Sequence, residues 1–182
     1  FNRSALLFAG EDGVAAVSII MYLQFLCIGI YFGFSMGLST PLGYAYGDRN
    51  FSVCRVLEKY AYRFFAIAPI ILYGCTYLLT PIGVRFFASP GSTVFNMAVS
   101  GMRLYGLGFL FSGINIFAAI RMMTYGKGYI SGMITFLRSF ALLLLFLTVL
   151  PRFLELNGIW LAVPAAEILT LIVALWTLRK KL

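Results

Sequence analysis

The sequence predicts an all-α integral membrane protein with five full transmembrane helices, and three observations support this fold class. Hydrophobic residues make up 62% of the 182 residues, charged residues only 11%, and the mean hydropathy is +0.94. A soluble domain carries about 25% charged residues. The few charges also separate apolar runs that reach the roughly 20 residues a helix needs to cross a bilayer. Because backbone facing lipid must satisfy its own hydrogen bonds, each run is expected to be helical.

Charged residues and turn residues divide the chain into a helix stub and five spans. Residues 1–10 are expected to be the last turns of a helix that begins upstream, so the chain is interpreted as a piece of something longer. The first span, residues 14–46, exceeds a perpendicular crossing and must tilt, bend or continue along the interface. The remaining spans are expected at residues 64–84, 94–120, 129–150 and 159–178.

The first span carries a stripe of small residues on one helical face. Gly29, Gly33 and Gly37 lie four residues apart. This spacing lets the backbone of a neighbouring membrane helix approach closely. The stripe therefore predicts that this face packs against another helix.

Lys and Arg are distributed unequally between the two ends of the spans. One side collects Arg49, Arg55, Lys59, Arg63, Arg121, Lys127, Arg179, Lys180 and Lys181. The other has Arg85 and Arg152, with Arg103 near its boundary. Because basic residues accumulate in cytoplasmic loops, the C-terminus is expected in the cytoplasm. The net charge of +8 is thus attributed to membrane topology, and no nucleic-acid partner is expected.

The chain offers little chemistry for catalysis or metal binding. It has no histidine, which removes the usual metal ligand and the usual proton carrier at neutral pH. Cys27, Cys54 and Cys75 lack metal-ligand spacing and are expected to be reduced packing residues. The GLG sequence at residues 106–108 matches a nucleotide-binding motif only weakly, because it lies in a helical run. We expect neither an enzyme nor a metal site.

Two ionisable residues lie deep inside predicted spans, Arg138 in the fourth and Glu167 in the fifth. At about 1.5 Å per residue, Arg138 lies roughly 16 Å from Lys127, and Glu167 roughly 18 Å from Arg179. The two residues therefore have matching depths on consecutive antiparallel helices. Since an unpaired charge at the bilayer centre costs about 2.5–3.5 kcal/mol, the sequence predicts an ion pair or a shared hydrated pocket. The pair would be a static clamp, or Glu167 would titrate or meet cations.

Two segments resemble the multidrug and toxic compound extrusion (MATE) transporters. In GFSMGLSTPLGYAYGDRNFSVCRV, residues 33–56, a glycine-bearing helix ends in a proline turn, followed by Tyr44, Tyr46–Gly47 and Arg49–Asn50. Residues 137–171 contain an Arg within a span, a Pro at the outer turn, Gly-Ile-Trp and a Pro-x-x-Glu helix, in the order of the family's last two helices. The sequence departs from the family at Ala45, usually Asn, and at Asp48, often Ala.

The resemblance implies that residues 1–182 are the C-terminal lobe of a twelve-helix transporter whose N-terminal lobe is absent from this chain. The whole protein would lie in a bacterial cytoplasmic (inner) membrane. As a secondary antiporter it would export organic cations or other amphipathic compounds through a central cavity between the lobes. A transported sodium ion or proton would drive export, with no cofactor. The implied partners are the missing lobe, the bilayer and amphipathic or cationic small molecules.

Polar residues on the first and third spans are candidates for the substrate path. They are Gln24, Ser35, Ser39, Ser100, Ser112 and Asn115. By resemblance, helices matching these spans face the central cavity, although ordinary interhelical hydrogen bonding would also explain such residues. Some family members carry a sodium-binding carboxylate on the helix matching the third span. Here that span has no Asp or Glu, so a cation site in this lobe is not expected.

Two other functions fit the same composition. A flippase for lipid-linked precursors or polysaccharide, from the same superfamily, would share the bundle but should carry several basic residues in its cavity. Here only Arg138 is deep among the basic residues. A membrane scaffold subunit without transport would be favoured if no second half accompanied this one.

Overall fold

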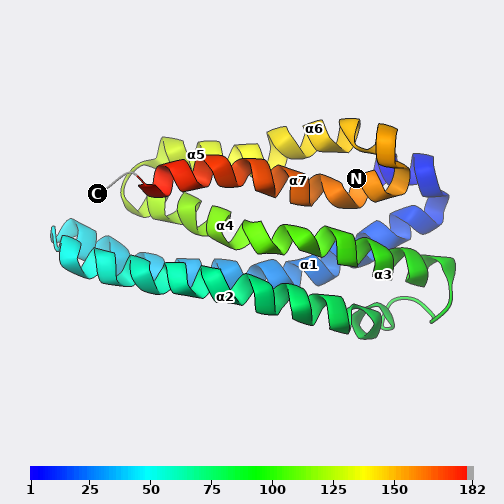
Figure 1. Ribbon diagram of the computed structural model, residues 1–182, viewed down its shortest axis with the longest axis horizontal. Helices are drawn as coiled ribbons and strands as arrows, with labels where there is room; N and C mark the ends of the chain where they lie inside the picture. The colour runs from blue at the N-terminus through cyan, green and yellow to red at the C-terminus, as the bar shows by residue number, and fades with distance from the viewer. Residues whose placement is uncertain (180–182) are drawn as a thin grey trace.

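The computed structural model describes residues 1–179, which form helices that run side by side along one long axis (Figure 1). The helices are α1 (Asn2–Gly47), α2 (Phe51–Val84), α3 (Thr93–Tyr105), α4 (Phe109–Thr124), α5 (Gly128–Phe136), α6 (Leu142–Val149) and α7 (Pro151–Arg179). A 3₁₀ turn, η1 (Gly106–Gly108), joins α3 to α4, and a π-helical turn, η2 (Leu137–Ala141), joins α5 to α6. These turns keep each pair of helices continuous.

Five helical segments are long and apolar enough to cross a membrane, so the all-α fold class with five spans is confirmed. They are Asn2–Gly47, Phe51–Val84, Thr93–Thr124, Gly128–Val149 and Pro151–Arg179. The second segment begins at Phe51 rather than near residue 64. Its basic residues lie on the first turns of α2 because Asn50 starts the helix early, accepting a hydrogen bond from the Val53 amide at 3.3 Å.

The turn between α1 and α2 follows from three successive residues. The Asp48 amide still donates to the Tyr44 carbonyl at 3.0 Å, which closes the last turn of α1. Arg49 then adopts a left-handed backbone with φ of 56° and reverses the chain. Asn50 caps α2 with its side chain. These polar residues therefore end one helix and start the next within a few residues.

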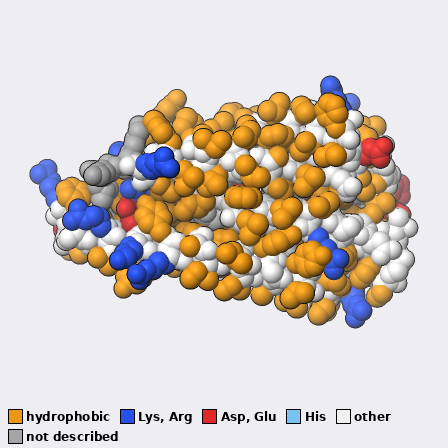
Figure 2. Space-filling model, in the orientation of Figure 1, with side chains coloured by type: hydrophobic (Ala, Val, Ile, Leu, Met, Phe, Trp, Pro, Cys, Tyr) orange, Lys and Arg blue, Asp and Glu red, His pale blue; other side chains and the backbone are white. Residues whose placement is uncertain are grey.

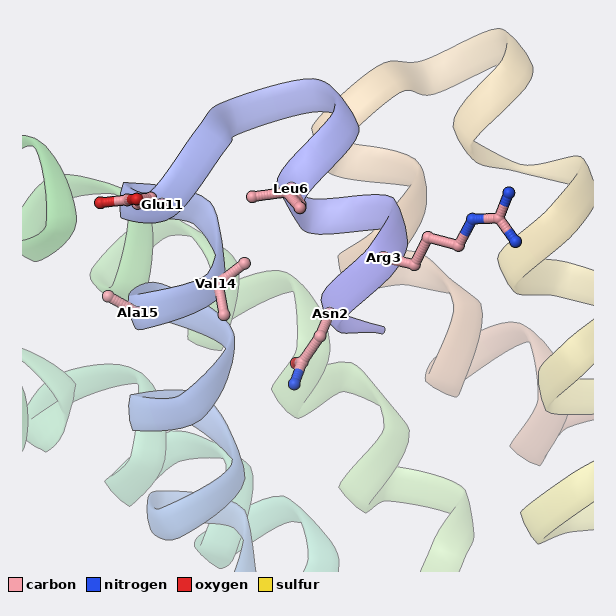
Figure 3. A pocket seen from close by; sticks show the side chains of 6 residues that line it. All are labelled: Asn2, Arg3, Leu6, Glu11, Val14 and Ala15. Atoms are coloured by element: carbon pink, nitrogen blue, oxygen red, sulfur yellow. The ribbon is translucent and has the colours of Figure 1, made fainter.

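α1 contains a sharp break near its beginning. Gly10 has φ of +61°, a conformation that favours glycine because it has no Cβ. The residues before Gly10 form a short helical segment that turns back beside the start of the long helix, as Figure 3 shows. This segment corresponds to the predicted stub. A second break occurs in α7 at Glu155, with φ of 48°.

The core of the bundle surrounds α4, which contacts α1, α2, α5 and α7. Trp160, Tyr31, Phe109 and Phe117 are among the largest fully buried side chains. At two positions of the α3–α4 segment, glycine allows side chains of neighbouring helices to pack closely against the backbone. A Cβ on Gly113 would lie 2.8 Å from the ring of Phe65 and 3.2 Å from that of Tyr31, and one on Gly101 would lie 2.8 Å from Trp160.

The glycine stripe on α1 does not pack as the sequence predicted. A Cβ added at Gly29, Gly33 or Gly37 would meet nothing within 4 Å among the described residues. The buried face of α1 instead includes Tyr31 and Ser35. The prediction of a packed stripe is therefore wrong for this part of the chain, because glycine spacing alone does not identify which face of a helix is covered.

Basic side chains gather at one end of the bundle, where α1, α4 and α7 end, as the left side of Figure 2 shows. We call this the basic end. Its exposed members are Arg49, Arg55, Lys59, Arg63, Lys127 and Arg179, while the predicted members Lys180 and Lys181 lie outside the described residues. The opposite end carries Arg85 and Arg152, and apolar side chains dominate the surface between the two ends.

Candidate functional site

Arg138 and Glu167 form an ion pair inside the bundle. One terminal guanidinium nitrogen of Arg138 lies 2.6 Å from Oε1 of Glu167, and its Nε donates to the same oxygen at 3.1 Å. The exposed fractions of the two side chains are 11% and 5%. Both donors converge on Oε1, and Nε also reaches Oε2 at 3.4 Å. Hydrogen bonds between ionised groups are stronger than those between neutral ones. The structure thus contains the pair that the depths in the sequence predicted.

Asn115 on α4 completes this cluster. Its side-chain amide donates to Oε2 of Glu167 at 2.7 Å and to the Glu167 carbonyl at 2.9 Å. Asn115 is fully buried, and its Oδ1 has no hydrogen-bond partner among the described residues. Both carboxylate oxygens of Glu167 therefore accept hydrogen bonds. We call Asn115, Arg138 and Glu167 the acid cluster.

The π-helical turn η2 sets the position of Arg138. It interrupts the α-helical pattern between α5 and α6, and Arg138 lies within it. A π turn adds a residue to one turn of the helix and is frequent at functional sites. The acid cluster therefore joins η2, α4 and α7 at one level of the bundle.

The other candidate polar residues do not join the acid cluster. Gln24 is half-buried and accepts a hydrogen bond from the Tyr105 hydroxyl. Ser39 donates to the Met36 carbonyl of its own helix at 2.7 Å. Ser35 and Ser112 are buried, and neither hydroxyl has a partner in the described part of the chain. Ser100 is exposed and donates to the Asn96 carbonyl at 2.8 Å.

A second buried ion pair, between Glu58 on α2 and Arg121 on α4, was missed by the sequence reasoning. The sequence counted Arg121 among the basic residues of the side that holds the C-terminus, and the structure shows that its side chain is buried. Arg121 is only 2% exposed, its Nε donates to Oε1 of Glu58, and a terminal nitrogen donates to the Thr177 carbonyl at 3.5 Å. The early start of α2 explains why the pair was missed, because it places Glu58 on a helix rather than in a loop.

Two tyrosines extend this second pair toward the basic end. Tyr125 follows α4 directly, and its hydroxyl donates to Oε1 of Glu58 at 2.7 Å. Burial, with a smaller contribution from this hydrogen bond, raises the pKa of the Tyr125 phenol, which keeps it protonated as a donor. The ring of Tyr46 packs on that of Tyr125 with centroids 4.4 Å apart. We call Glu58, Arg121 and Tyr125 the basic-end cluster.

A hollow lies between the residues before and after the break in α1, but its polar side chains do not form a binding site. Its cavity volume is about 520 Å³, and Arg3 and Glu11 are its charged lining residues. Figure 3 shows their side chains pointing away from one another. The two charges therefore do not converge on a common ligand.

Comparison with known families gives one match for this chain. A model of the MatE family matches residues 4–150, which is most of the chain. A comparison with curated protein sequences gives no match.

Solved transporter structures share this fold. An outward-facing multidrug resistance MATE family transporter of the MOP superfamily has a TM-score of 0.86 and 22% identity. A MATE in complex with MaL6 has a TM-score of 0.87 and 21% identity. A MOP superfamily transporter from Pyrococcus furiosus, described as having a binding pocket of reverse polarity, has a TM-score of 0.85 and 21% identity. Each comparison covers 97% of this chain but only 40% of the other.

Proposed function

Because the chain belongs to the MatE family of transporters, we propose that it is the C-terminal lobe of a secondary antiporter. In this proposal the whole protein exports organic cations or other amphipathic compounds in exchange for sodium ions or protons. The observation that carries it is the family match over residues 4–150 together with a bundle of five apolar spans. The chain spans about 40% of the length of the transporters with the same fold, consistent with one lobe of two.

We propose that the acid cluster acts mainly as a clamp between helices. Glu167 accepts from Arg138 and Asn115, so both of its oxygens are occupied by donors. Glu167 is also buried, so neither oxygen is open to a transported cation. The coupling carboxylate is therefore expected outside the third span, which has no Asp or Glu, and outside this cluster.

Ser39 is the better candidate for contact with substrate. It lies on α1 and is not buried, whereas Ser35, Ser112 and Asn115 are covered within the bundle. Gln24 lies on the same helical face as buried Ser35, and its side chain accepts a hydrogen bond from Tyr105. The face of α1 that carries Gly33 and Phe25 is open in this lobe. Aromatic walls with a few polar groups suit flat cations of varied shape. In this proposal that open face lines the cavity, and the three buried residues hold the helices together.

The proposed orientation places the basic end in the cytoplasm. Exposed Lys and Arg gather there, whereas the opposite end carries few. The proposed location is the bacterial inner membrane, with several passes. The asymmetry of basic residues near span ends is the physical basis for this assignment.

An export assay on the full-length protein tests the function. Reconstituted in liposomes, it should move an organic cation only when a sodium or proton gradient is imposed, and collapsing that gradient with the matching ionophore should stop export. Dependence on one ionophore identifies the coupling ion. Movement of a fluorescent lipid-linked sugar instead would favour a flippase, and no movement of either would favour a scaffold; both results would overturn the proposal.

A further inference from the structure

Arg103 on α3 is a third basic residue within the apolar part of the bundle, but it has no carboxylate partner among residues 1–179. Its guanidinium carbon lies 4.5 Å from the centroid of the Tyr77 ring on α2. Its backbone carbonyl accepts a hydrogen bond from the Tyr73 hydroxyl at 3.4 Å. The sequence placed Arg103 near the boundary of one side; it lies at the end of α3, ten residues after Thr93 in the continuous α3–α4 segment.

The guanidinium N–H groups of Arg103 have no hydrogen-bond partner among the described residues. Its Nε is buried and has no hydrogen-bond partner. The two ion pairs among residues 1–179 use Arg121 and Arg138, each with its own glutamate. A guanidinium has five N–H donors and no acceptor, so one left unpaired in an apolar setting calls for an anion.

The direction of the side chain indicates where that anion lies. α2 runs from the basic end toward the opposite end, so Tyr77 is one turn nearer the opposite end than Tyr73. The backbone of Arg103 is held at Tyr73, while its guanidinium lies over Tyr77. The side chain therefore extends toward the opposite end of the bundle, as long basic side chains do when they reach from apolar surroundings toward a headgroup layer.

The surroundings of the guanidinium are exposed in the described chain. Tyr77 is 43% exposed, and its neighbours Leu78 and Leu79 are 73% and 55% exposed. Tyr77 lies seven residues before the end of α2 at Val84, or about 10 Å along the helix axis. At this depth the guanidinium is within reach of a lipid phosphate that lies against the bundle surface, slightly below the headgroup layer.

We propose that Arg103, stacked on Tyr77, binds the phosphate of an anionic lipid in the leaflet at the opposite end of the bundle. The phosphate would accept from the free guanidinium donors, while the acyl chains would lie against the apolar surface beside Leu78. Guanidinium matches phosphate with paired N–H···O bonds, and the tyrosine ring fixes its plane. This site is independent of the transported compound.

Native mass spectrometry of the full-length protein in detergent tests the proposal. Phosphatidylglycerol is added as the probe, with phosphatidylcholine of the same acyl chains and inorganic phosphate as parallel probes. Arg103→Gln should reduce the phosphatidylglycerol-bound fraction at least threefold, and Arg103→Lys should retain an intermediate fraction. The matched control is Arg85→Gln, because Arg85 is exposed at the end of α2, the helix that carries Tyr77, and it should reduce binding little.

The outcomes separate the sources of the anion. Preference for phosphatidylglycerol over both other probes, lost in Arg103→Gln, supports the lipid site. Displacement of lipid by inorganic phosphate alone would overturn the lipid assignment, as would equal lipid binding by Arg103→Gln and the unchanged protein. If Arg103→Gln fails to fold, Tyr77→Leu, which keeps the charge but removes the ring, should still weaken binding measurably, and unchanged binding would overturn the proposal.

Discussion

Each of the two buried carboxylates that form ion pairs accepts from an arginine and from one uncharged donor. Glu167 has Arg138 and the amide of Asn115, whereas Glu58 has Arg121 and the hydroxyl of Tyr125. A buried ion pair contributes little when complete, because desolvation offsets much of the attraction. Removal of one partner is different, since it leaves an uncompensated charge and costs about 3–5 kcal/mol.

Glu167→Gln should lower both the melting temperature and the export activity of the full-length protein, because it leaves Arg138 without its carboxylate. Arg138→Gln should act similarly. The charge-swapped double variant, Arg138→Glu with Glu167→Arg, should recover part of both losses, and melting in detergent with an export assay measures this. Ser139→Ala, at an exposed neighbour of Arg138, is the control. Full transport and unchanged melting in Glu167→Gln would exclude any coupling role and also the clamp.

The basic-end cluster gives a second residue-level prediction. Glu58→Gln should destabilise the protein by about 3–5 kcal/mol because Arg121 stays buried. Tyr125→Phe should cost about 1–3 kcal/mol, since it removes one donor to a charged group. Replacing both members of the pair, Glu58→Leu with Arg121→Met, should recover most of the loss. Thermal unfolding in detergent compares the variants, and equal melting of Glu58→Gln and the unchanged protein would contradict the prediction.

These residues show what sequence reasoning can and cannot find. Arg138 and Glu167 stand alone in apolar spans, so their depth could be counted from the nearest basic residue. Glu58 and Arg121 lie close to other charges, and nothing local in the sequence separates them from a solvated loop. Only the packing of α2 against α4 buries them. Their one sequence signal is that Glu58 lies alone among the basic residues at positions 55–63.

At the scale of the elements, the position of a glycine on its helix matters more than its spacing. Gly101 and Gly113 lie on the central α3–α4 segment and admit side chains from neighbouring helices. Gly33 belongs to a regular stripe, yet it faces no described residue. A small residue therefore marks close packing only where the helix is surrounded.

Gly113→Ala and Gly33→Ala form a matched pair of variants that tests this difference. The added Cβ at residue 113 would lie 2.8 Å from Phe65, so overpacking should cost about 1–3 kcal/mol. At residue 33 the Cβ meets open space, and alanine favours the helix by up to about 1 kcal/mol. Melting temperatures in detergent compare the two. A lower melting temperature for Gly33→Ala than for Gly113→Ala would contradict the packing described here.

At the scale of the whole molecule, the two clusters join overlapping sets of helices at different levels. The acid cluster connects η2, α4 and α7, and the basic-end cluster connects α2, α4 and the carbonyl of Thr177 on α7. Since α4 belongs to both, the clusters hold the outer helices to one central helix. In the proposed two-lobe transporter, a lobe built in this way would move as a unit against the second lobe.

The proposed orientation makes a testable prediction for the full-length protein in cells. In a background where Cys27, Cys54 and Cys75 are replaced by alanine or serine, a single cysteine at Lys127 should resist a membrane-impermeant maleimide added outside. A cysteine at Arg152 should react, because it lies at the opposite end of the bundle. Permeabilised cells provide the control, in which both positions react. The reverse pattern in intact cells would show that the basic end faces outward.

The sequence by itself determined the membrane class, the five helices and the matching depth of Arg138 and Glu167. These properties depend on local composition and on the fixed rise of a helix, both of which can be counted along the chain. Tertiary structure decided which helical faces are covered: it left the Gly33 stripe open, buried Arg121 against Glu58 and left Arg103 beside Tyr77 without a carboxylate. Burial depends on which helices pack against each other, and that packing is decided by contacts between residues far apart in the sequence.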